Sequence, residues 1–151
     1  MSYVDKDKGL QYFIYDTAVD MTGGTGDIIV LPIPEPASGK IQVIKMGYQL
    51  RAATSAAVTM TTAAELVLDH RTTGAATSTE LGSMTLPVST AAYLNEIEDL
   101  NATSTTENLY TEPDYPEIDL SAGEYLVFAR DTQGVGGTQS IMPWIEYRIV
   151  E

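Results

Sequence analysis

The sequence predicts an all-β protein: an antiparallel two-sheet sandwich of the jelly-roll type, with one short helix and an extended N-terminal arm. Three observations predict this class. Apolar side chains recur at every second residue over residues 41–71, the spacing at which alternate strand residues share one face of a sheet. Turn-forming residues separate roughly seven to nine such runs along the chain. Threonine, valine, isoleucine and tyrosine, which favour pleated surfaces, are common.

The chain of 151 residues is long enough for one domain with a real core. We predict an N-terminal arm with a glycine-rich hinge over residues 1–26 and the sandwich domain over residues 27–151. The arm contains four consecutive residues that are too apolar to remain in water without a docking surface, and we predict that they contact a partner. These are Tyr12, Phe13, Ile14 and Tyr15. The alternative is that Tyr12 and Ile14 belong to an ordinary edge strand of the same domain.

The predicted strands follow in order along the sandwich. Residues 27–33 form a continuous apolar run, typical of a strand buried on both faces. Three prolines end it, because proline has no N–H to donate to a neighbouring strand. Pro143 in the last strand predicts an edge position or a bulge. The further strands are expected at residues 40–51, 58–69, 80–86, 124–130 and 140–150, with short extended pieces in 109–120.

The one predicted helix covers residues 90–100. Apolar residues there are spaced as on one face of a helix, at Tyr93, Leu94, Ile97 and Leu100. Ser89 or Thr90 would cap its N-terminus. Such a short segment predicts one to three turns.

The net charge of −13 is large for this length and argues against nucleic-acid binding, which requires clustered lysine and arginine. No Lys or Arg lies between Arg71 and Arg130, although that segment is rich in Asp and Glu. We interpret this segment as a solvated acidic surface. Two alternatives remain: a surface matched to a basic partner, and a weak calcium site formed by Asp114, Glu117 and Asp119.

No group of residues predicts catalysis, and we expect no catalytic, cofactor-binding or metal-binding residues and no enzymatic activity. The chain has no cysteine, and His70 is the only histidine, so neither a thiolate site nor a two-histidine metal centre can form from it. Trp144, Tyr147 and Tyr125 could form a sugar-stacking platform or belong to the core or an interface. No signal peptide and no membrane span are predicted.

From residue 33 onward the order of features resembles the small β-sandwich head decoration (cement) proteins of tailed bacteriophages. The similarity covers residues 33–70 and 118–150. It rests on turn and strand placement: the proline-containing IPEPASG at 33–39, the strand IQVIKMGYQL at 41–50, the long strand from Val58 to Asp69, and LSAGEYLV at 120–127. The segment 90–117 is not part of the resemblance.

The resemblance implies a non-enzymatic virion protein that binds the outside of the capsid, clamps neighbouring subunits of the major capsid protein, and forms a homotrimer. It implies assembly in the bacterial cytoplasm, with no nucleic-acid or membrane partner and no cofactor. The alternative is a carbohydrate- or receptor-binding jelly-roll module of a phage tail or fibre.

Overall fold

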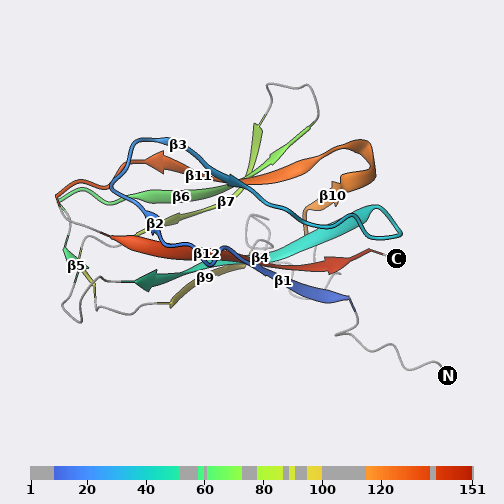
Figure 1. Cartoon of the computed structure of the whole chain (residues 1–151), viewed down its shortest axis with the longest axis horizontal. Coiled ribbons are helices and arrows are strands. Elements are labelled where there is room, and N and C mark those ends of the chain that lie inside the picture. Colours follow the sequence, from blue (N-terminus) through green and yellow to red (C-terminus); the bar gives the residue numbers. More distant parts are fainter. Residues whose placement is uncertain are drawn as a thin grey trace, which may run out of the picture.

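The computed structural model describes residues 9–51, 58–59, 61–72, 78–86, 89–90, 95–99, 115–136 and 139–150. Within these ranges the chain forms two antiparallel sheets that lie face to face as the layers of a sandwich (Figure 1). The predicted all-β class and the two-sheet antiparallel arrangement are confirmed.

The larger sheet has six strands in the order β1-β12-β4-β10, with β2 also paired to β12 and β9 also paired to β4. Its longest pairing joins β4 to β12, the final strand of the chain. The bounds are β1 Leu10–Ile14, β2 Val19–Asp20, β4 Lys40–Arg51, β9 Asn95–Asp99, β10 Glu117–Asp119 and β12 Ser140–Ile149.

The second sheet has four strands in the order β3-β11-β6-β7. Their bounds are β3 Gly26–Val30, β6 Glu65–Arg71, β7 Ser78–Thr85 and β11 Tyr125–Thr132. A small two-stranded ladder joins β5 (Val58–Thr59) to β8 (Ser89–Thr90). The one helical piece in the described residues is a 3-10 turn, η2 (Leu120–Ala122).

The core lies between the two sheets and is filled by alternate strand residues. Ile141, Ile145 and Tyr147 of β12 point inward with Met46 and Tyr48 of β4, and both β4 side chains have no exposed surface. Leu66, Leu68, Leu126 and Phe128 meet them from the four-stranded sheet. This period of two is the pattern that predicts strands in the sequence.

The predicted helix over residues 90–100 is wrong where the structure describes this segment, and residues 91–94 and 100 lie outside the described residues. Residues 89–90 and 95–99 are strands, and β9 pairs with β4 from Gln49↔Asn95 to Lys45↔Asp99. A physical reason is that β4 has an edge of backbone donors and acceptors that a strand can satisfy and a helix cannot. This tertiary pairing overrides the helix-like spacing of the apolar residues.

Residues 10–20 lie against the sandwich, in the larger sheet. β1 pairs with β12 over its whole length, from Leu10↔Arg148 to Ile14↔Trp144, and β2 pairs with Ser140 and Ile141. Met21, which follows β2, has no exposed surface. This is the edge-strand arrangement that the sequence left as the alternative to a detached arm.

The glycine-rich segment at residues 21–26 is held by side chains from β11 and the loop after it. Arg130 donates from Nε to the carbonyl of Gly24 (2.6 Å) and from a terminal nitrogen to the carbonyl of Asp20. Gln133 donates to the carbonyl of Thr22 (2.8 Å). A Cβ at Gly23 would lie 2.8 Å from the Arg130 guanidinium, so a larger residue there would require the Arg130 side chain to shift.

Pro143 is neither at a sheet edge nor at a bulge, which corrects the expectation for it. It lies in β12, paired with Tyr48, between β4 and the N-terminal strands. Its carbonyl accepts from the N–H of Tyr15, just after β1 ends. The missing proline N–H therefore faces the interruption between β1 and β2, where it removes no ladder bond from either strand.

Candidate functional site

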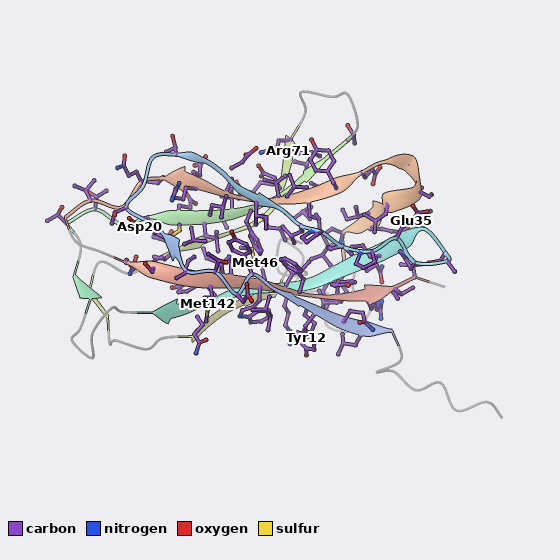
Figure 2. All side chains as sticks on the ribbon, in the orientation of Figure 1. Tyr12, Asp20, Glu35, Met46, Arg71 and Met142 are labelled. Carbon is purple, nitrogen blue, oxygen red and sulfur yellow. The ribbon has the colours of Figure 1, made fainter. Side chains whose placement is uncertain are left out.

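The outer face of the six-stranded sheet gathers exposed apolar and aromatic side chains. On β1, Tyr12 is 60% exposed and Ile14 is 58% exposed. Trp144 and Met142 of β12 are half-buried and belong to the same face, because they alternate with the core residues Ile141 and Ile145. Figure 2 shows Tyr12 and Met142 on the side of this sheet that faces away from the other sheet, whereas Met46 lies between the two sheets. We call this face the outer patch.

The centre of the outer patch is a row of three residues on adjacent strands. Tyr12, Glu146 and Lys45 lie directly opposite one another in the two ladders. The Tyr12 hydroxyl donates to Glu146 Oε1 (2.8 Å), and Lys45 Nζ lies 3.8 Å from Glu146 Oε2. Glu146 is only 8% exposed although it points away from the core. The carboxylate thus holds the exposed Tyr12 ring in one position on the sheet.

A β-bulge in β4 brings Lys45 to this row. Glu146 pairs with Lys45, but the next residue of β12, Tyr147, pairs with Val43, so Ile44 is the extra residue. Val43 and Met46 are therefore both buried, although their spacing of three would place them on opposite faces of a regular strand. Bulges commonly re-aim side chains next to functional sites.

Arg148 and Gln42 form the next row along β12. The Arg148 Nε donates to Gln42 Oε1 (2.7 Å), and Arg148 also lies opposite Leu10 of β1. The outer patch therefore combines two aromatic rings with a fixed guanidinium and an amide. Such a surface can stack on or pack against flat groups and donate hydrogen bonds beside them.

The four residues predicted as the partner-contacting arm divide between the two faces of the sheet. Tyr12 and Ile14 point outward and are exposed, whereas Phe13 and Tyr15 are partly buried and pack against the core. Alternation along β1 explains the division.

The structure does not bring together Trp144, Tyr147 and Tyr125 as a platform. Trp144 lies on the outer patch, Tyr147 is 8% exposed in the core, and Tyr125 lies on β11 of the other sheet. Burial raises the pKa of the Tyr147 hydroxyl. The residue opposite Trp144 is instead Ile14, from the other end of the chain, and Tyr12 lies on the same face two residues before it. Sequence spacing does not indicate that Tyr12 and Trp144 share a face.

The remaining predicted candidates have structural contacts in the described residues. His70 Nε2 lies 3.1 Å from Glu124 Oε2, which also accepts from the Asp119 N–H (2.7 Å). Asp119 caps η2, and the hydrogen bond from the Ser121 hydroxyl lowers the pKa of its carboxyl. Glu117 pairs with Lys40 at 3.1 Å.

The calcium alternative named Asp114, Glu117 and Asp119, and Asp114 lies outside the described residues. Among those that are described, no group of three metal-ligating side chains converges. The described part of the chain also contains no helix with the length and apolarity needed to cross a membrane.

Comparison with known proteins found no matching family model, no similar curated protein and no similar solved structure.

Proposed function

We propose that this protein is a non-enzymatic structural component of a bacteriophage virion. It binds the outside of the capsid and stabilises contacts between subunits of the major capsid protein. The resemblance to head decoration proteins supports this class of partner. The jelly-roll topology belongs to the same proposal, supported by two antiparallel sheets in which spatial neighbours such as β4 and β12 are distant in sequence.

The observation that carries the proposal is the outer patch. The described residues include four exposed large apolar side chains, and two of them, Tyr12 and Ile14, belong to this patch. They lie two residues apart on the same face of β1, and Ile14 is directly opposite Trp144. Contiguous exposed apolar surface of this kind marks interaction sites. Tyr, Trp and Arg are the residue types that dominate binding energy at protein interfaces, and Tyr12, Trp144 and Arg148 supply one of each.

Co-sedimentation tests the proposal. Purified protein is mixed with expanded, undecorated capsids of the phage that carries the gene, and the pelleted fraction is measured against protein concentration. We expect saturable binding by the wild type and at least a tenfold loss in Tyr12→Ala and in Trp144→Ala, since anchor side chains contribute about 1.4 kcal/mol or more.

Val30→Ala is the matched control for these variants. Val30 is 54% exposed on β3, an edge strand of the other sheet, so its loss removes a comparable exposed side chain away from the outer patch. We expect its binding to remain at the wild-type level. Wild-type protein that stays in the supernatant at every concentration would rule out the capsid function.

The second candidate is a carbohydrate- or receptor-binding module of a tail or fibre. It is favoured by the same two rings, because the exposed Tyr12 and the half-buried Trp144 lie on one face of the sheet together with the polar groups of Gln42 and Arg148. A glycan array distinguishes the candidates: selective glycan binding that is lost in Trp144→Ala, without capsid binding, would support the module.

A further inference from the structure

Arg148 is distinguished from the other cations of this acidic chain by its contacts. Its Nε is held by Gln42, and its terminal nitrogens have no carboxylate within ion-pair distance among the described residues. The other lysines and arginines with described side chains are already engaged. Lys40 pairs with Glu117, Lys45 with Glu146, and Arg71 with Asp27 and Asp69, while Arg130 donates to backbone carbonyls.

The charge of the outer patch thus differs from that of the whole molecule. The chain carries a net charge of −13, yet the carboxylate at the centre of this patch, Glu146, is buried and matched by Lys45. The Arg148 guanidinium next to it adds a positive charge that no described carboxylate balances. Although the chain as a whole is strongly acidic, it presents the Arg148 cation next to the exposed apolar side chains of the outer patch.

We infer that the outer patch docks on an apolar surface of the capsid subunit that presents a carboxylate, which binds the terminal nitrogens of Arg148 in the row between Leu10 and Gln42. This inference rests on the proposed capsid function and specifies the chemistry of the partner. It reverses the expectation from composition, which is that a strongly acidic protein seeks a basic partner.

The geometry favours a carboxylate over other acceptors. The planar guanidinium fork matches the two oxygens of a carboxylate, and the bond from Nε to Gln42 fixes the direction of the fork. Packing of the partner against Tyr12, Ile14 and Trp144 would exclude water from the ion pair and strengthen it.

Capsid binding by Arg148→Gln tests the inference, with Arg71→Gln as the matched control. The control makes the same chemical change and removes the same charge, but Arg71 lies on the other sheet, on the opposite side of the molecule from Tyr12 (Figure 2). We expect affinity to fall at least about 30-fold in Arg148→Gln, the loss typical of a desolvated charge pair. The capsid affinity of Arg71→Gln should stay within about twofold of the wild-type affinity, because the Arg71–Asp27 ion pair lies outside the outer patch and faces solvent.

A second experiment leaves the protein unaltered and thus does not depend on the folding of a variant. Surface carboxylates of the capsids are converted to neutral amides with a carbodiimide and an amine, and wild-type binding is measured again. Simple charge repulsion between an acidic protein and the shell predicts tighter binding after amidation. Our inference predicts weaker binding, by a factor similar to that in Arg148→Gln.

The outcomes separate the inference from the function on which it rests. If the wild type binds capsids, and both Arg148→Gln and capsid amidation leave that affinity within threefold, the carboxylate partner is wrong and the capsid function stands. If the wild type does not bind capsids, both are wrong. Melting curves of the two variants identify any loss of binding that comes from unfolding.

Discussion

Glu146 shows how a single polar residue can organise an exposed surface. A carboxylate that is 8% exposed on the solvent side of a sheet must be hydrogen-bonded, because an unpaired buried charge costs several kcal/mol. The Tyr12 hydroxyl and the Lys45 ammonium meet this need from the two flanking strands. The same hydrogen bond restricts the rotamers of the Tyr12 side chain in the unbound protein, which lowers the entropic cost of binding a partner.

Gly39 provides a stability test at the same scale. It has a φ of 75°, and a Cβ there would lie 2.8 Å from the Ser121 side chain, which follows β10. We expect Gly39→Ala to lower the free energy of unfolding by about 1–2 kcal/mol and the melting temperature by about 2–8 °C. Thermal unfolding followed by circular dichroism measures this.

Gly24→Ala is the control for that substitution. No atom lies within 4 Å of a Cβ built at Gly24, and its φ is not in the left-handed region. We expect no loss of stability there, since alanine reduces the freedom of the unfolded chain without strain. Equal losses at both glycines would contradict this account of Gly39.

The role of individual residues was only partly predictable from sequence. Alternation around Tyr12 and Ile14 correctly separates them from Phe13 and Tyr15 by face once β1 is recognised as a strand. Their neighbour Glu146 could not be predicted, because it is 134 residues away and no local pattern encodes strand register over that distance. For the same reason, the sequence does not indicate that Tyr12 and Trp144 lie on one face of the sheet.

At the scale of elements, side chains join strands that do not touch. On the outer side of the four-stranded sheet, Arg71 of β6 reaches across β11 to Asp27 of β3, with two nitrogen–oxygen distances of 2.7 Å. The same guanidinium lies 3.3 Å from Asp69. The hydrogen bond from Arg71 lowers the pKa of Asp27 below its ordinary value of 3.8.

Asp27→Asn tests this connection through pH. A lowered pKa in the folded state stabilises the fold above the unfolded-state pKa, and that contribution is lost as the pH falls through the folded-state pKa. We expect Asp27→Asn to be about 0.5–1 kcal/mol less stable than the wild type at pH 7, a modest value because the pair is partly exposed. The difference should shrink toward zero below about pH 4 in urea titrations.

Asp16→Asn controls for the change in net charge. Asp16 is exposed and makes no ion pair in the described part of the chain, so its loss reduces self-repulsion without breaking a contact. We expect it to match or exceed the stability of the wild type at pH 7. A pH-independent loss in Asp27→Asn would show that the side chain acts by packing instead of charge.

Elements were predictable where their own residues determine them. The strands around residues 40–51, 124–130 and 140–150 consist largely of apolar and strand-favouring residues and were predicted close to their observed bounds. Residues 95–99 were mispredicted as helix because β9 forms to complete an edge of β4, and the sequence of β9 does not reveal that edge. The position of Pro143 was likewise mispredicted, because a proline fits inside this sheet only where β1 ends before β2 begins, and the sequence does not show that interruption.

At the scale of the whole molecule, the N-terminal segment is expected to be needed for folding. Deletion of residues 1–22 would remove β1, β2 and the buried side chains of Val19 and Met21. Each such side chain contributes about 1.5–3 kcal/mol, which is large against a typical total of about 5–15 kcal/mol. We expect the truncated protein to show no cooperative thermal transition by circular dichroism.

Met21→Ala separates the core contribution from the loss of the strands. We expect a folded protein that is about 2–5 kcal/mol less stable than the wild type, measured by urea unfolding. A truncated protein that melts near the wild-type temperature, and has lost only capsid binding, would instead support the detached arm predicted from the glycine-rich segment.

The place of β12 in the larger sheet has a consequence for the order of synthesis and folding. Its partners β1, β2 and β4 are all made before residue 52, but β12, which joins them, is made after every other strand of the two sheets. The four-stranded sheet is complete in sequence by Thr132 and can pair earlier. The six-stranded sheet can close only after β12 has been made, through contacts of very long sequence separation that form slowly. Until then β4 keeps an open edge, so the nascent chain is most exposed to aggregation just before β12 (Ser140–Ile149) emerges.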